Sequence, residues 1–525
     1  MSRLGTNYRG LGMKNLSAYT RTCFRRFITL KTRPKTDVKL GQPSYETRNH
    51  ILPTPGNLTP GISAIEYFQR RLKLAAQLPD KSLAIIVGNT TKFSSGSVFY
   101  DFQQDNDLYY LTGWLEPDTV MVLEKKGSHG RDEDVALHLL VPPKNPSREQ
   151  WEGSKTGLEG ACEFFNADNV EDVSKAASYI KSLISRNNTI FYDSKYQAKP
   201  ATESLFKSFF DFGGGKGNDS MMLNDIILKS GKSINPLRKV IDRLRSVKSC
   251  AEIEVMHAAG QISSRAFNKA MGKVASESPI QTEKTLAKYL EYQFVKGGCD
   301  KQAYIPVVAS GPNALTIHYT RNDDLLYQDE LVSVDAGGKL GGYCSDISRA
   351  WPNSSKGFSE PQRDIYQAVL NTNRSCIDLC HEGSNYSFHD IHEFSVRCLR
   401  KELQNITGFQ NVTYQDIRVL YPHFIGHHLG LDLHDVPSVS RNERFVEGNV
   451  ITIEPGLYIP ENSSWPKHFQ GIGVRVEDDI VVGKTSDEII NLSSGCVKEI
   501  ADIESLIRNG VSTPGIDAEL VVLDI

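Results

Sequence analysis

Two hydrophobic patterns alternate along residues 61–240. Apolar positions recur at helical spacing from Ala64 to Ala76, and a second helical pattern lies near 171–186. Short continuous apolar runs, typical of buried strands, occupy 83–87, 119–123, 137–141 and 189–192. Strands that alternate with helices in this way predict an amino-terminal α/β domain over 61–240.

A different pattern begins at residue 241 and predicts a second domain over 241–525. Ser249 and Glu252 form a capping-box pattern, and an amphipathic helix follows them. Another helix is expected near 283–296. A similar pair recurs around 365–376 and 388–404, and each pair precedes strands. This internal duplication predicts two α/β halves related by a pseudo-twofold axis.

Three short apolar strands of the second domain each carry one acid. Side chains two positions apart share a face of a strand. In 331–335, 450–454 and 473–477, the acids Asp335, Glu454 and Glu477 therefore lie opposite Val or Ile side chains. Arg475 shares the face of Glu477. Asp346 follows Asp335 across the glycine-rich stretch 337–342, which predicts a hairpin that returns Asp346 to the neighbourhood of Asp335.

Acids in apolar strands are unfavourable unless positive charge lies among their oxygens. The carboxylates of Asp335, Asp346, Glu454 and Glu477 carry a charge of −4, which two divalent cations would neutralise, with His427 as a neutral fifth ligand. Ligands of this kind suit Mn, Zn, Co or Fe better than a thiolate-loving ion. We expect two divalent metal ions, with Mn as the first choice. The alternative for any single acid is a solvated strand end.

The five residues match, in order and local sequence, the metal ligands of the aminopeptidase P / prolidase family. The resemblance covers about Ile65 to Val482 and is most specific over 424–481. Within this family the chain resembles the mitochondrial intermediate-cleaving, Xaa-Pro type aminopeptidases. The resemblance implies an α/β (α+β) chain in which an amino-terminal α/β domain precedes a catalytic domain with the pita-bread fold.

The resemblance also implies a role for each ligand. Asp335, Asp346 and Glu477 would hold one metal, and Asp346, His427, Glu454 and Glu477 the other. A water between the two ions would become the hydroxide nucleophile. Glu454 would in addition carry a proton from this water to the leaving amine.

Further site residues follow from the same resemblance. His318 and His434 match active-site histidines that would stabilise the oxyanion, whereas His428 is expected to face away from the metals. Tyr304 and His423 match a pocket for the side chain after the scissile bond.

Two of the matched residues have structural alternatives. Arg475 is placed beside the same pocket, although it could instead form a structural ion pair with a carboxylate ligand. Asp107 is expected either near the substrate amine or as a simple turn acid.

The chain begins with a basic segment. Residues 1–36 are rich in Arg, Lys, Ser and Thr and contain no acid, which predicts a mitochondrial transit peptide. The alternative is a basic tail that binds an acidic partner. Residues 37–60 predict a linker. We expect the protein in the matrix or on the matrix side of the inner membrane, and a second location stays open.

Composition excludes several classes of function. The 525 residues carry a net charge of −3, with no basic footprint for nucleic acid. No apolar run approaches the ~18 residues of a membrane span. Nine scattered cysteines indicate a reducing compartment. The glycine-rich stretch 213–217 lacks a phosphate-loop ending and predicts a flexible loop.

The first functional hypothesis is a mitochondrial aminopeptidase that removes one amino-terminal residue from peptides or proteins, above all from intermediates left by presequence cleavage. Strict Xaa-Pro aminopeptidase or prolidase specificity is the alternative, because Tyr304, His423 and Arg475 match a pocket that accommodates proline. A metal-free binding module of the same fold is a further alternative, which the presence of all five ligands disfavours. A homo-oligomer, most simply a dimer, is expected by analogy.

Overall fold

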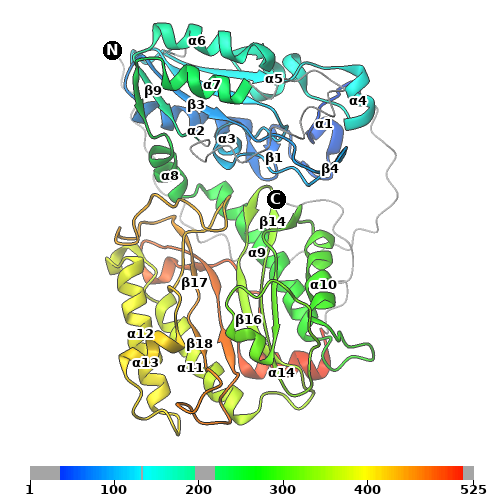
Figure 1. Cartoon of the computed structure of the whole chain (residues 1–525), viewed down its shortest axis with the longest axis vertical. Helices are drawn as coiled ribbons and strands as arrows, with labels where there is room; N and C mark the ends of the chain where they lie inside the picture. Colours follow the sequence, from blue (N-terminus) through cyan, green and yellow to red (C-terminus); the bar gives the residue numbers. More distant parts are fainter. Residues whose placement is uncertain (1–35, 132–133, 195–218, 512–525) are drawn as a thin grey trace.

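The structure is a computed structural model that describes residues 36–131, 134–194 and 219–511. Two bodies lie one above the other in Figure 1, the amino-terminal domain in blue and cyan with the green helix α7 (Asp219–Leu228), and the larger second domain in green to red. The expected transit peptide, apart from residue 36, and the expected loop at 213–217 lie outside the described residues.

A mixed six-stranded sheet in the order β10-β9-β3-β6-β7-β8 forms the amino-terminal domain. Its strands are β3 (Ser82–Val87), β6 (Val120–Lys125), β7 (Val135–Val141), β8 (Asn169–Asp172), β9 (Thr189–Tyr192) and β10 (Ser233–Asn235). The four strands predicted from apolar runs are confirmed as β3, β6, β7 and β9.

Helices cover both faces of this sheet. Along β3, Leu83 and Ile85 join the hydrophobic cluster that includes helix α6 (Ala176–Arg186). Ala84 and Ile86 join the cluster that includes helix α2 (Ala64–Gln77). Burial on both faces explains the continuous apolar runs. The helix expected near 171–186 begins later than predicted, because residues 169–172 pair with β7 as strand β8.

Residues 37–60, expected as a linker, contain short elements that pack on this domain. They include helix α1 (Tyr45–Arg48) and strand β1 (Asn57–Thr59), which pairs with β2 (Ile62–Ser63). The buried side chain of Gln42 donates to the carbonyl of Gly113 (2.9 Å) and accepts from the amide of Leu115 (2.7 Å).

The second domain repeats the order helix, helix, strands. Its first half has α9 (Cys250–Met271), α10 (Glu283–Lys296), β12 (Val307–Ser310), β13 (Leu331–Ala336) and β16 (Ile347–Pro352). Its second half has α11 (Glu360–Ile377), α12 (Phe388–Gln404), β17 (Val450–Ile453), β20 (Asp478–Val481) and β21 (Ile490–Asn491). The two helix pairs lie on opposite sides of the strands (Figure 1). The predicted duplication and the capping box at Ser249 are therefore confirmed.

Four short strands form two further hairpins in this domain. They are β14 (Gly338–Leu340), β15 (Tyr343–Cys344), β18 (Gly456–Tyr458) and β19 (Gly473–Arg475). The predicted strands 450–454 and 473–477 were too long, because β17 ends at Ile453 and β19 at Arg475. The Asn373 side-chain amide bonds the carbonyls of Ile453 (3.0 Å) and Val476 (3.2 Å) at those ends. Glu454 and Glu477 thus follow directly after fixed backbone carbonyls.

Two negative observations apply to the described residues. No helix there is both long and apolar enough to cross a bilayer. The eight cysteines of this part of the chain are all free thiols.

Candidate metal centre and active site

A hairpin brings Asp346 back beside Asp335, as the sequence predicts. Strands β14 and β15 form the hairpin, and the turn residues Gly341 and Gly342 have positive φ angles of 55° and 86°. Gly337 lies so close to the returning chain that a Cβ would sit 1.8 Å from the carbonyl oxygen of Ser345. Only glycine permits this approach.

Tyr304 joins the two acids. Its hydroxyl is hydrogen-bonded to Asp335 Oδ1 (2.5 Å) and also to Asp346 Oδ1.

His427 and Glu454 are brought together by a second close approach. The segment before His427 pairs with β17, so that the Glu454 amide donates to the Ile425 carbonyl (2.8 Å). Gly426 permits this pairing, since a Cβ there would lie 1.9 Å from the Thr452 carbonyl oxygen. His427 Nε2 then lies 3.4 Å from Asp346 Oδ2 and 3.8 Å from Glu454 Oε1.

Glu477 completes the cluster from the strand end after β19. It is only 2 % exposed, and Ser348 Oγ donates to its Oε2 (2.7 Å). Within the described residues its Oε1 atom is buried and has no hydrogen-bond partner. One ligand atom each from Asp346, His427 and Glu477 lie within 4.8 Å of one another. The five residues named from the sequence therefore converge.

Three of the four acids of this cluster have raised pKa values; against burial, His427 and Tyr304 lower only the pKa of Asp346. Burial raises the pKa of Asp335 to about 6 and the pKa of Glu454 to about 7. Burial and the neighbouring carboxylates raise the pKa of Glu477 well above its usual value. Burial opposes charge on His427, yet Asp346 and Glu454 raise its pKa to about 9. The cluster attracts positive charge, as a metal site must.

The proton on His427 is placed by its backbone contact. Its Nδ1 lies 2.9 Å from the His428 carbonyl, which can only accept a hydrogen bond. Nδ1 therefore carries a hydrogen in either charge state, so Nε2 is the nitrogen that can give up its proton to bind a metal. This is the arrangement in which histidine binds a metal. The donor set and the unpartnered Glu477 oxygen fit divalent ions.

The predicted active-site histidines lie beside this cluster. The His434 ring centroid is 4.2 Å from that of His427, and burial lowers the pKa of His434. The exposed His318 lies within electrostatic range of both His423 and His434, whose pKa values are lowered mainly by burial. His428 instead packs edge-on against Phe388, and burial lowers its pKa to about 3.

A connected group extends from Asp335 to His423. Arg475 Nη2 pairs with Asp335 Oδ2 (2.6 Å), and its Nη1 donates to the Tyr458 hydroxyl (2.7 Å). That hydroxyl is 3.0 Å from His423 Nε2. The ion pair considered from the sequence as the alternative role of Arg475 is thus present. Burial lowers the pKa of His423 to about 3, so its imidazole is neutral at physiological pH.

Asp107 lies at the contact between the domains, on helix α3 (Asn106–Thr112). Its Oδ1 is 2.5 Å from Arg245 Nη1, and Arg245 also pairs with Asp432 (2.7 Å) and Asp435 (2.5 Å). Burial raises the pKa of Asp107 to about 6 even beside Arg245. Arg245 thus links the amino-terminal domain to the segment that carries His434.

Several residues that shape the site were not singled out from the sequence. They are Arg245, Glu283, Ser348, Asn373 and Tyr458. The completely buried Glu283 accepts from the Ser310 amide (2.9 Å), Asn313 Nδ2 (3.0 Å), the Tyr319 hydroxyl (2.9 Å) and the Asp324 amide (2.9 Å). Its four partners all belong to the segment that carries His318. No spacing in the sequence connects this helix residue to that segment.

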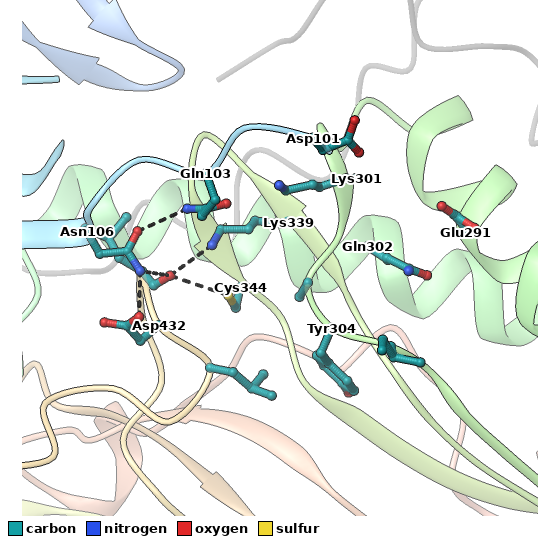
Figure 2. A pocket seen from close by; sticks show the side chains of 14 residues that line it. Asp101, Gln103, Asn106, Glu291, Lys301, Gln302, Tyr304, Lys339, Cys344 and Asp432 are labelled. Carbon is teal, nitrogen blue, oxygen red and sulfur yellow. Dashed lines mark hydrogen bonds between the residues drawn. The ribbon is translucent and has the colours of Figure 1, made fainter. Parts of the chain in front are cut away.

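A cavity of about 430 Å³ lies between the domains, next to Tyr304. Gln103 and Asn106 of the amino-terminal domain line it together with Lys301, Lys339 and Tyr304 of the second domain, and Figure 2 shows Gln103 beside Lys339. A second, smaller cavity of about 40 Å³ lies beside Asp107 and Arg238.

Comparison with known proteins agrees with this geometry. A model of metallopeptidase family M24 matches residues 254–484, which contain all five converging residues. The chain belongs to this family. A model of the aminopeptidase P amino-terminal domain matches residues 67–192. The resemblance expected from the sequence is therefore confirmed, as is an amino-terminal domain followed by a pita-bread catalytic domain.

The similarity to individual relatives extends over nearly the whole chain. Intermediate cleaving peptidase 55 of Saccharomyces cerevisiae is 49% identical over 485 residues, which are 92% of each protein. Xaa-Pro aminopeptidase 3 of Homo sapiens is 34% identical over 500 residues, 92% of this chain and 94% of that protein. The crystal structure of Saccharomyces cerevisiae Icp55 lacking its N-terminal 58 residues has a TM-score of 0.76 at 46% identity, covering 87% of this chain and 100% of that one. The chain is a metallopeptidase and uses divalent metal ions.

Proposed function

We propose that this metallopeptidase removes a single residue from the amino termini of peptides and proteins in mitochondria, and that intermediates left by presequence cleavage are its substrates. The observation that supports the chemistry best is the cluster of two buried acids, two half-buried acids and His427, in which Arg475 is the one basic side chain that pairs with an acid among the described residues. The name of the intermediate cleaving peptidase, with which the chain shares 49% identity, supports the substrate class. The basic, acid-free segment 1–36 supports the location.

We infer that two divalent ions complete the cluster, with Mn the first choice and Zn, Co or Fe as alternatives. Asp335, Asp346 and Glu477 would hold one ion, and Asp346, His427, Glu454 and Glu477 the other. When bound, such ions polarise the scissile carbonyl and lower the pKa of a water molecule. The unpartnered Glu477 oxygen and the position of His427 Nε2 beside Asp346 and Glu454 support this assignment.

Glu454 is positioned to move a proton. Its Oε1 faces His427 Nε2 (3.8 Å), while its Oε2 faces His423 Nδ1 (3.9 Å). One oxygen can thus act as a ligand while the other accepts a proton and passes it to the leaving amine. A glutamine at this position keeps the shape but cannot carry the proton.

His434 and His318 would bind the oxygen of the scissile peptide bond. His434 has a lowered pKa and is neutral at pH 7, so one ring nitrogen can donate a hydrogen bond. Donors directed at a developing negative charge accelerate acyl transfer. We assign His423 and Arg475 to the side of the site that receives the residue after the scissile bond, where Tyr458 links them.

Strict Xaa-Pro specificity is a second candidate, supported by the name of the human relative. Purified protein with Mn should release one residue from a peptide with a Tyr or Leu start and no second-position proline. Release only from Xaa-Pro peptides would favour the second candidate. Glu454→Gln should stop turnover while circular dichroism shows a folded protein, and full activity of this variant would refute the assigned role.

We further propose that the chain forms a homo-oligomer, most simply a dimer, as expected by analogy with the family. Light scattering on the purified protein measures this directly. A mass equal to one chain would contradict it.

A further inference from the structure

We propose that the cavity between the domains receives the side chain of the substrate's first residue, and that Lys339 makes this cavity select against cationic side chains. Neutral and acidic first residues would be accepted. The inference rests on the proposed aminopeptidase function and adds its specificity.

The cavity is lined by the same segments that carry the proposed metal ligands. Tyr304 lines it, and the Tyr304 hydroxyl contacts Asp335 and Asp346. This places Tyr304 on the side of the first residue, whereas the resemblance implied the pocket for the residue after the scissile bond. Cys344 lines it two positions before Asp346. A residue whose carbonyl lies at the metal centre can therefore reach the cavity with its side chain.

Leu431 and Leu433 extend this lining from the segment between His427 and His434. The group formed by His423, Tyr458 and Arg475 shares none of its residues with the lining. We assign it to the other side of the scissile bond.

The amino-terminal domain forms one wall of the cavity, through Asp101, Gln103 and Asn106. Asn106 Nδ2 donates to the Leu431 carbonyl (3.1 Å) and to Asp432 Oδ1 (2.6 Å), as Figure 2 shows. This contact fastens the two walls of the cavity to each other. The cavity therefore suits the end of a polypeptide better than its continuation.

Two lysines give the cavity its charge. Lys301 and Lys339 are direct partners across β14 and the short strand β11 (Lys301–Gln302), and both line the cavity. Like charges directly opposite each other destabilise a strand pair. Lys339 is 7 % exposed, and its Nζ donates to the Leu431 carbonyl (3.1 Å). Among the described residues, the structure gives neither lysine an ion pair.

The acids that also line the cavity do not cancel this charge. Asp432 is paired with Arg245, and Glu291 with Lys288. Asp101 is exposed. Asp300 lies close enough to interact electrostatically with both lysines, but its carboxylate accepts hydrogen bonds from the backbone amides of the 341–342 turn. A cationic first residue would place another positive charge beside a buried one, at a free-energy cost that a neutral side chain avoids.

The test compares kcat/KM for peptides that differ only in a first residue of Leu, Glu, Lys or Arg. The wild-type protein should hydrolyse the Lys and Arg peptides about tenfold less well than the Leu peptide, since like charges disfavour binding. In Lys339→Met, the ratio of the Lys peptide to the Leu peptide should rise about tenfold, and Lys339→Arg should restore the wild-type ratio. Lys181→Met removes one exposed charge on helix α6, outside the cavity, and should leave the ratio unchanged.

An unchanged ratio in a folded, active Lys339→Met protein would overturn the inference, as would a wild-type protein that is active without any charge preference. If Lys339→Met does not fold, Lys339→Gln, which also removes the charge, takes its place, and an unchanged ratio in that variant would overturn the inference. If the wild-type protein releases no first residue from any peptide, the proposed function fails and the specificity fails with it, which is a distinct result.

Discussion

Glu477 and Asp478 are neighbours in the chain, both are buried, and their surroundings are opposite. Asp478 pairs with Arg349 (2.7 Å) and Lys498 (2.5 Å), and these cations overcome the effect of burial and hold its pKa below the usual value. Glu477 faces other acids, and its pKa is raised. Asp435 resembles Asp478, because its ion pairs with Arg245 and Lys248 hold its pKa below the usual value.

The contrast distinguishes two uses of a buried acid. An acid with its own cations stabilises the fold, because each charge is balanced within the protein. An acid without them lowers the stability of the chain and is retained where another cation supplies the balance. The cluster around Glu477 is of the second kind, and this supports the proposed metal centre more directly than the residue types alone.

The largest effect is expected for activity in Glu477→Gln. Loss of a metal ligand should lower kcat/KM by at least about 10⁴-fold. Enzymes accelerate their reactions by about 10⁶-fold or more, and in a metallopeptidase most of this acceleration depends on an intact metal centre. The metal-free protein should be at least as stable as the wild type, since an uncompensated acid is removed. Steady-state kinetics and thermal unfolding without metal measure the two quantities, and a metal-free variant much less stable than the wild type would contradict the comparison.

Asp478→Asn should have the reverse effect on stability, and the metal-free variant should be less stable than the wild type. It leaves Arg349 buried without its charged partner, so the free energy of unfolding should fall by about 3–5 kcal/mol. Denaturant titration of the metal-free protein measures this. A loss below about 1 kcal/mol, as for a surface ion pair, would show that the pair does not stabilise the fold.

The pH dependence of metal binding should follow the raised pKa values. Asp335 and Glu454 have pKa values of about 6 and 7, so protons occupy these acids as the pH falls from 7.5 to 5.5 and compete with the metal. Mn affinity should fall by about tenfold for each displaced proton over this range. Asp478 stays ionised throughout, so its ion pair should be unaffected. A Mn affinity that does not change with pH, measured by isothermal titration, would contradict the raised values.

Glu283→Gln tests a third kind of buried acid, which is satisfied by neutral donors. Glutamine turns one acceptor into a donor opposite the Tyr319 hydroxyl or a backbone amide, so the segment carrying His318 should shift. We expect kcat/KM to fall by about tenfold, in the range of one lost hydrogen bond to a charged group. The effect should be much smaller when His318→Ala is already present, whereas an additive effect in the double variant would show that Glu283 acts elsewhere.

The sequence predicted those parts of the site that depend on local pattern. Asp335 and Asp346 flank a glycine-rich hairpin, and the hairpin was recognisable from its turn residues. The strand ends at Glu454 and Glu477 were misplaced, because a side chain on α11 fixes them and no local pattern records that contact. Glu283 and Arg245 escaped notice for the same reason: their partners are distant in the chain. Pairing with β7 likewise overrode the expected helix start near 171.

The most direct test of the account is the metal content of the purified protein after equilibration with Mn and removal of free ions. Elemental analysis should find two ions per chain in the wild type, and fewer in Glu477→Gln. Asp478→Asn should retain two if it is assayed where it remains folded. A wild-type protein that binds no divalent ion under these conditions would contradict the claim that the uncompensated acids form a metal centre.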